Sequence, residues 1–185
     1  MAWIETIDES EASKDLQEIF SIIKKKRGEI ANILKIQSLL PITMKDHLNF
    51  YTHIMFNKST IPREEKELIA VVVSSINNCA YCIHHHAEAL NYYWKDKAKI
   101  DELIETLDYT NLSLRNQAIV SYAEKLTKQP DQVTEEDIKK LRTHGLSDKE
   151  ILEIALIIAY FNFVNRMALG LHVEFTDEEM KGYEY

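Results

Sequence analysis

The chain has 185 residues, a length that suits one well-buried core and does not require two domains. Its 22 basic and 30 acidic residues give a formal net charge of -8, which opposes binding to nucleic acid because phosphate contacts need clustered Lys and Arg. With only four glycines and three prolines, the composition favours helices joined by short connections.

The N-terminal half shows helical periodicity and no alternating strand pattern. Apolar residues recur every three or four positions over 15–34 and over 44–56, which predicts helical structure in both stretches. Pro62 suits the first turn of a further helix, and the acidic residues after it favour that turn through the helix dipole. This helix should continue to about Ile76.

The first turn of that helix contains Glu64 and Glu65, which are expected to face solvent. Asn77 and Asn78 interrupt the helical pattern, because asparagine favours turns and caps over helix interiors. A new helix should therefore begin near Cys79.

The C-terminal half continues the helical pattern. The amphipathic stretch 114–127 ends before Pro130, and the stretch 135–144 ends at Gly145, a good C-terminal cap. Together with the first half, these patterns predict an all-α, single-domain helical bundle over residues 1–185.

Two capping signatures follow. Ser147 with Glu150 predicts the start of a long helix that runs to about Leu169, and Thr176 with Glu179 predicts one short helix at the end of the chain.

The last long helix contains the longest apolar stretch, residues 151–164. It has about 14 residues, includes Glu153 and Asn162, and falls short of the roughly 18 that suggest a membrane span, so we expect a buried helix and no membrane partner. Because it is apolar nearly all round, a small helical monomer would hardly hide it, and we expect a homo-oligomer, as a trimer or hexamer. The start, MAWIETIDES, lacks the features of a secretory signal, which favours a cytoplasmic location.

Both cysteines of the chain and three of its histidines lie within eight residues, in the segment NNCAYCIHHHAEA. At about 100° per residue, Cys79, Cys82 and His86 share one stripe of a helix, whereas His84 and His85 point elsewhere, toward the surface or a partner. Both thiols lie in the first helical turn, where unpaired N–H groups and the helix dipole lower the pKa of a thiol. This placement favours redox chemistry.

A structural zinc site is the main alternative for this cluster. Such a site needs four ligands, commonly as two separated pairs, and no second Cys or His pair follows at that spacing. Haem attachment of the c type needs a histidine where Ile83 stands. We therefore expect no metal and no other cofactor.

Glu67 is expected to lie close to His86. If the Asn77–Asn78 turn joins two antiparallel helices, Glu67 stands about ten residues before the turn and His86 about nine after it, which makes them nearly level at about 1.5 Å per residue. Glu67 would then reach His86 or a water beside Cys82. A surface carboxylate and a packed, hydrogen-bonded histidine are the alternatives without a chemical role.

The arrangement of Glu67, Cys79, Cys82 and His86 resembles the alkylhydroperoxidase D branch of the carboxymuconolactone decarboxylase family. The similarity extends through REEKELIAVVVSSINNCAYCIHHHAEAL, AIVSYAEKLTKQP and YFNFVNRMALGLHVE, and covers about residues 35–175. The resemblance implies a helical, oligomeric protein that reduces organic hydroperoxides with a cysteine pair and takes its electrons from an external dithiol of the lipoyl or thioredoxin type.

Carried over by position, the resemblance implies that Cys82 is the peroxidatic thiol, that Cys79 is the resolving thiol, and that Glu67 with His86 forms a proton relay. Physical reasoning from the sequence alone does not rank the two cysteines, since both belong to the first helical turn. Carboxymuconolactone decarboxylation does not require a redox pair, so the pair favours a peroxidase.

One position departs from the family. Alkylhydroperoxidase D has a histidine directly before its second cysteine, and here that residue is Tyr81. A phenol with a pKa near 10 is a poor base at neutral pH, which predicts a weaker relay or a different substrate. The alternative function is that of a noncatalytic, redox-responsive oligomer whose disulfide acts as a switch.

Overall fold

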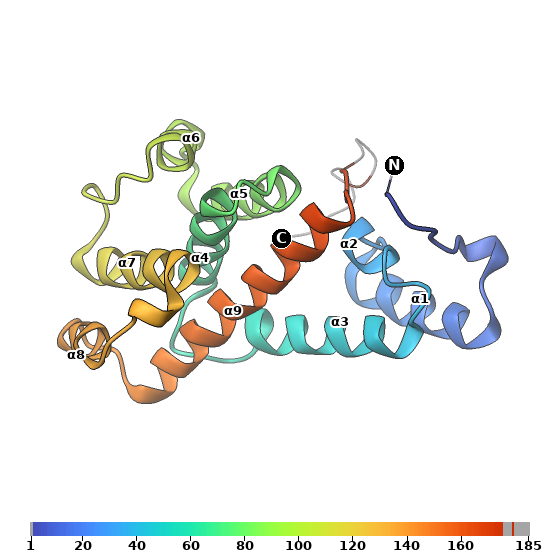
Figure 1. Ribbon diagram of the computed structural model, residues 1–185, viewed down its shortest axis with the longest axis horizontal. Coiled ribbons are helices and arrows are strands. Elements are labelled where there is room, and N and C mark those ends of the chain that lie inside the picture. The colour runs from blue at the N-terminus through green and yellow to red at the C-terminus, as the bar shows by residue number, and fades with distance from the viewer. Residues whose placement is uncertain (1, 176–178, 180–185) are drawn as a thin grey trace. The chain divides into compact units, whose positions relative to one another are not determined.

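The computed structural model describes residues 2–175 and 179 (Figure 1). Contacts divide the chain into a terminal unit, residues 1–53 and 166–185, and a central unit, residues 54–165. Every regular element of the described residues is a helix, which confirms the all-α class. The single domain expected over residues 1–185 stays a prediction.

The terminal unit begins with the 3-10 helix η1 (Glu9–Glu11), followed by α1 (Lys14–Arg27), α2 (Asn32–Lys35) and most of α3 (Pro41–Phe56). Its core is apolar and is drawn from α1, α2 and α3: Leu16, Ile19, Phe20, Ile23, Leu34, Met44 and Leu48.

The helical stretch predicted over 15–34 is broken at Gly28. This residue caps α1 with a φ of 80°, a conformation that glycine adopts without a steric penalty. The chain then turns before α2 begins. The periodic apolar residues on both sides of the break still reach one core, which is why the sequence pattern looks continuous.

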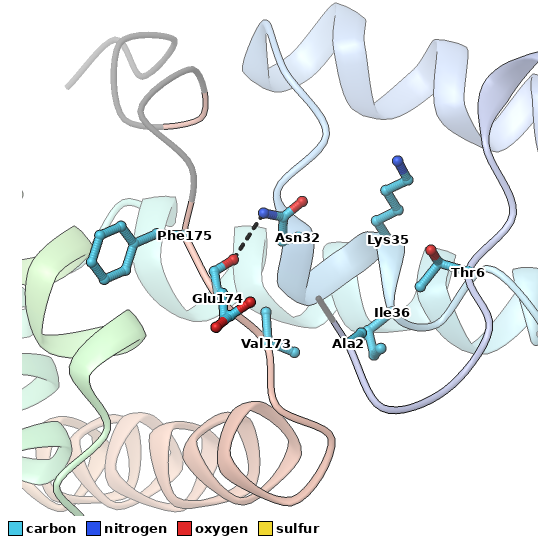
Figure 2. Close-up of a pocket in the computed structure, with 8 residues that line it drawn as sticks. All are labelled: Ala2, Thr6, Asn32, Lys35, Ile36, Val173, Glu174 and Phe175. Carbon is cyan, nitrogen blue, oxygen red and sulfur yellow. Dashed lines mark hydrogen bonds between the residues drawn. The ribbon is translucent and has the colours of Figure 1, made fainter.

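The terminal unit also contains a small cavity of about 200 Å³, shown in Figure 2. The Asn32 side chain donates a hydrogen bond to the carbonyl oxygen of Glu174 at its edge, over 2.9 Å. Lys35, Ile36 and Val173 contribute to the lining, which mixes apolar and polar groups. None of the lining residues belongs to the cysteine segment.

The central unit is built from helices with short connections. These are α4 (Arg63–Ile76), α5 (Ala80–Trp94), α6 (Lys97–Thr106), α7 (Leu114–Lys128), η2 (Pro130–Gln132), α8 (Glu135–Thr143) and α9 (Asp148–Gly170) as far as residue 165. The predicted helices of this region are confirmed to within one or two residues at each end, whereas α6 was not predicted. Its start is marked by Asp96, whose side chain accepts the N–H of Lys99 over 3.1 Å.

Helix α4 forms the core of the central unit. The segment 68–73, LIAVVV, has no exposed surface, because α4 packs against α5, α6 and α7. In Figure 1, α4 lies between α5 and α7. A helix that is buried on all sides holds its polar side chains in fixed positions, and this applies to Glu67, which directly precedes the segment.

The N-terminal part of α4 has two buried ionic contacts. Lys66 is 1 % exposed and donates to Glu153 of α9 over 2.6 Å and to the carbonyl oxygen of Ile54 over 2.9 Å. Glu65 pairs with Arg115 of α7 over 3.0 Å. The expectation that Glu65 faces solvent is therefore wrong, because α7 covers that side of α4.

Helix α9 begins with the predicted capping box. Glu150 accepts the backbone N–H of Ser147 over 2.7 Å, and its own N–H donates to the Ser147 hydroxyl over 3.4 Å. By length and composition α9 could cross a membrane, but 56 % of its apolar window is buried, as in the core helix of a folded domain. The short helix predicted from Thr176 falls on residues 176–178 and 180–185, outside the described residues.

Candidate active site

The turn between α4 and α5 places the cysteines. Asn77 caps α4, Asn78 takes the left-handed conformation with a φ of 54°, and Cys79 is the N-cap of α5. Asparagine tolerates the left-handed region better than other residues with a side chain. The backbone N–H of Cys79 donates to the carbonyl oxygen of Ser74 over 2.9 Å, which closes the turn. The predicted interruption at these asparagines is confirmed.

Both cysteines are free thiols and almost fully buried, Cys79 at 1 % and Cys82 at 2 % exposed. A hydrogen bond from the Cys82 thiol lowers the pKa of Cys79, against the opposing effect of burial. The same contact, together with burial, raises the pKa of Cys82. The shared hydrogen bond therefore separates the pKa values of the two thiols and favours the first negative charge on Cys79.

Glu67 and His86 meet across the two helices, as their level positions predicted. The carboxylate of Glu67 accepts a hydrogen bond from Nδ1 of His86 over 2.7 Å. The Glu67 side chain is fully buried and the His86 side chain is 14 % exposed. With its proton on Nδ1, the neutral imidazole has a free lone pair on Nε2. The ring of Phe161 stands edge-on to the imidazole at 4.5 Å and fixes its orientation.

The carboxylate of Glu67 is held in its ionised form. Burial alone would raise its pKa, but the charges and hydrogen bonds of His86 and Arg63 outweigh burial and lower the pKa below the ordinary value. Burial also lowers the pKa of His86, against the opposing effect of Glu67. At neutral pH the pair therefore consists of an ionised Glu67 and a neutral His86.

Arg63 is a partner that the sequence analysis missed. Its Nε donates to the second carboxylate oxygen of Glu67 over 2.6 Å, one helical turn along α4. The guanidinium also donates to the carbonyl oxygen of Met55 over 3.2 Å and lies 3.8 Å from the centre of the Phe56 ring. The i, i+4 spacing of Arg63 and Glu67 is the sequence signal for this pair.

Asn165 of α9 is a second missed residue, and it has no exposed surface. Its side-chain oxygen accepts a hydrogen bond from Asn77 over 2.9 Å, and its amide nitrogen donates to Ser74 over 3.1 Å. The side chain also offsets part of the rise in the pKa of Cys82. The only hint in the sequence is a polar residue within an otherwise apolar helix. Its contacts depend on how α9 packs, which the sequence alone does not reveal.

The two histidines beside His86, His84 and His85, are half-buried. His85 donates from Nδ1 to the carbonyl oxygen of Tyr81 over 2.8 Å, and the two rings are 4.4 Å apart. Tyr81, which stands where the related branch has histidine, is 6 % exposed and packs on His85. The partner interface expected for His84 and His85 stays a prediction.

Across residues 2–175 and 179, no three His, Cys, Asp or Glu side chains gather in a group that could hold a metal ion. The donor set at the start of α5 is suited to different chemistry. Two thiols in hydrogen-bond contact exchange two electrons when they form a disulfide, and an imidazole one helical turn after Cys82 can move a proton.

The chain is similar in sequence to a known family and to a bacterial protein. Residues 41–125 match the carboxymuconolactone decarboxylase family. Over 115 residues the chain is 27 % identical to the uncharacterized protein YdfG of Bacillus subtilis strain 168, covering 62 % of this chain and 78 % of YdfG.

Two solved structures are similar over nearly the whole chain. An uncharacterized peroxidase-related protein from Silicibacter sp. TM1040 gives a TM-score of 0.86 at 28 % identity, covering 99 % of this chain and 96 % of that chain. A second peroxidase-related protein, an alkylhydroperoxidase AhpD core from Ralstonia eutropha JMP134, gives a TM-score of 0.85 at 24 % identity, covering 97 % and 94 %. The second likeness shows the fold alone. Residues 41–125 thus resemble the carboxymuconolactone decarboxylase family, and the chain has the fold of these two peroxidase-related proteins.

Proposed function

We propose that the protein is a thiol-dependent peroxidase that reduces organic hydroperoxides. The observation that carries this proposal is the pair of free, hydrogen-bonded cysteines at the start of α5, one turn before an imidazole that a buried carboxylate holds in place. The match of residues 41–125 to the carboxymuconolactone decarboxylase family and the likeness to a peroxidase-related protein support it.

In the first step the thiolate of Cys82 attacks the terminal oxygen of the hydroperoxide. A sulfur–oxygen bond forms while the oxygen–oxygen bond breaks, so sulfur loses two electrons and the peroxide gains them. The leaving alkoxide takes up one proton and departs as the alcohol. Cys82 is left as a sulfenic acid.

His86, held by Glu67, transfers the proton in this step. The free lone pair on Nε2 of His86 accepts the thiol proton of Cys82, directly or through a water, and later gives it to the alkoxide. The ionised Glu67 stabilises the imidazolium that exists between these two transfers. Because Tyr81 is a poor base at neutral pH, His86 is the group that accepts the thiol proton in this relay.

In the second step Cys79 attacks the sulfenic sulfur. A disulfide forms between Cys79 and Cys82, and the sulfenic oxygen leaves as water after taking up the remaining proton. An external dithiol of the lipoyl or thioredoxin type then reduces this disulfide by thiol–disulfide exchange and is itself oxidised to a disulfide. The protein's own two thiols carry the electrons, so the cycle needs no cofactor.

The proposal includes assembly into a homo-oligomer, as a trimer or hexamer. On α9, Leu152, Leu156 and Phe163 are 60 %, 39 % and 44 % exposed. Their spacing of four and seven residues puts them on one face of the helix. Large apolar side chains gathered on one exposed face support contact with further copies of the chain.

The test is turnover of a panel of organic hydroperoxides and hydrogen peroxide, with a dihydrolipoamide-type or a thioredoxin-type dithiol in excess. Continuous consumption is expected with at least one pairing, and it should be lost in both Cys79→Ser and Cys82→Ser. If no pairing supports consumption beyond one equivalent per subunit, the peroxidase proposal fails. A single stoichiometric burst followed by a change in assembly would instead indicate a redox-responsive switch.

A further inference from the structure

Arg63 stands at a position where a helix gains little from a cation. It is the first residue of α4, at the positive end of the helix dipole, where acidic side chains are favoured. In its pair with Glu67 the basic residue precedes the acidic one, which is the weaker of the two orders for an i, i+4 pair. A residue that breaks two local rules of helix stability points to a role beyond the helix.

Three contacts hold the guanidinium of Arg63 in place. Its Nε donates to Oε1 of Glu67 over 2.6 Å, and its Nη1 donates to the carbonyl oxygen of Met55 over 3.2 Å. The ring of Phe56 covers one face, with its centre 3.8 Å from the guanidinium carbon. The positive charge is therefore fixed beside a carboxylate that has no exposed surface.

The two oxygens of Glu67 are divided between two partners. Oε1 accepts from Arg63, and Oε2 accepts from Nδ1 of His86. While the imidazole is neutral, the charges of Arg63 and Glu67 sum to zero. Without Arg63 the buried pair of Glu67 and His86 would carry an unbalanced negative charge, which is costly in a buried site. The pair would remove this charge by binding a proton on Nε2 of His86.

We propose that Arg63 keeps the relay free of a resting proton, because its fixed charge balances Glu67 and leaves Nε2 of His86 able to accept the thiol proton. Arg63 is thus a positioning residue that acts through Glu67. For its consequence in catalysis, the inference rests on the proposed peroxidase function. The direction of the pKa of His86 agrees, since burial, and in addition the charge of Arg63, lowers it against the opposing effect of Glu67.

The other groups around the relay do not supply this balance. On α5 they are the two thiols and His85, whose charge also lowers the pKa of His86. Helix α9 presents the ring of Phe161 to the imidazole, and the buried side chains of α6 are apolar. The charged residues of α7 and α9 that reach α4 are paired elsewhere, as Arg115 with Glu65 and Glu153 with Lys66. Among the residues that the structure describes, Arg63 is thus the cation that balances Glu67.

The test follows the titration of His86 by NMR of the histidine ring protons in the reduced full chain, with the signal assigned from His86→Gln. Arg63→Met should raise the midpoint by about one pH unit or more, since a neighbouring charge commonly moves a pKa by about one to three. Arg63→Lys keeps the charge and should leave the midpoint close to that of the parent. Arg63→Gln keeps a donor for Glu67 without the charge; it serves if the methionine variant does not fold, and should give the same rise.

Arg115→Met is the matched control. Arg115 also pairs with a carboxylate of the first turns of α4, that of Glu65, over 3.0 Å. Its loss should leave the midpoint of His86 unchanged.

Activity gives a second readout. In Arg63→Met, the acid limb of the rate of hydroperoxide reduction should move to higher pH together with the His86 midpoint. A rise of one pH unit lowers the rate on that limb about tenfold, and the rate should recover in alkaline solution. A merely structural role of Arg63 would lower the rate without moving the limb.

An unchanged His86 midpoint in Arg63→Met or Arg63→Gln would overturn the inference, and so would an equal rise in Arg63→Lys or in Arg115→Met. Peroxide turnover of the parent is measured separately. If the parent turns over and the His86 midpoint does not respond to Arg63, the inference fails and the function stands. If the midpoint responds and the parent shows no turnover, the function fails and the charge balance stands.

Discussion

Replacing Glu67 by Gln tests the proton relay, because it keeps the shape of the side chain and removes its charge. Two charge-assisted contacts are lost, to Arg63 over 2.6 Å and to His86 over 2.7 Å. Without the carboxylate, the pKa of His86 falls further and its Nε2 becomes a weaker base. The imidazolium also loses its stabilising charge, worth up to about 4 kcal/mol for a pair about 4 Å apart at an effective dielectric constant near 20.

Hydroperoxide reduction at neutral pH should therefore fall by at least about tenfold, or about 1.4 kcal/mol of barrier. Raising the pH should recover part of the loss, because the thiol then ionises without the relay. The assay is the initial rate over a pH series with dithiol in excess. Glu64→Gln is the control, since Glu64 lies on the same helix turn and accepts from Trp94 over 2.8 Å instead.

Stability gives an independent measure in the same variant. A buried pair that loses one partner costs about 3–5 kcal/mol, and the 20 % exposure of the Arg63 side chain puts the expected loss at the lower end. Because folding lowers the pKa of Glu67, its contribution is present above the ordinary carboxyl pKa and is lost as the pH falls through the lowered value. The parent and Glu67→Gln should thus differ most at neutral pH and converge in acid. A variant as fast and as stable as the parent across the series refutes the relay.

Three further predictions concern the fold, the thiols and the assembly. Lys66→Met should lower the free energy of unfolding by about 3–5 kcal/mol, because the charge of Glu153 is left buried without its partner. Adding Glu153→Leu should restore much of this loss. An unchanged midpoint of urea unfolding in Lys66→Met would contradict the prediction. Mild oxidation should remove two hydrogens from the mass, through a disulfide of Cys79 and Cys82 that a dithiol reverses, whereas stoichiometric zinc in protein purified without added metal would exclude this pairing. Light scattering should give a mass several times that of the 21.6 kDa chain, and a monomer at micromolar concentration would rule out the assembly.

Features set by neighbouring residues were predictable from the sequence. Spacing alone placed Glu67 level with His86, since the turn at Asn77 and Asn78 fixes the register of two antiparallel helices. The all-α class followed from apolar periodicity and capping residues in the same way. Local rules suffice wherever the partners belong to one helix or to two helices joined by a tight turn.

Features set by packing between distant helices were not predictable. Asn165 donates to Ser74 across 91 positions of the chain only because α9 packs beside α4. The position of Glu65 in the first turn of a helix predicted a solvated side chain, but Arg115 of α7 pairs with it. The break at Gly28 was hidden, because the apolar residues on either side of it contribute to one core. For Asn165 and Glu65 the deciding partner is remote in sequence.

The measurement that tests the central claim most directly is the site of the sulfenic acid. Cys79→Ser is treated with one equivalent of an organic hydroperoxide in the presence of dimedone, and the labelled peptide is identified by mass spectrometry. Attack by Cys82 predicts an adduct on Cys82. An adduct on Cys79 in Cys82→Ser, with none in Cys79→Ser, would contradict the account and exchange the roles of the two cysteines.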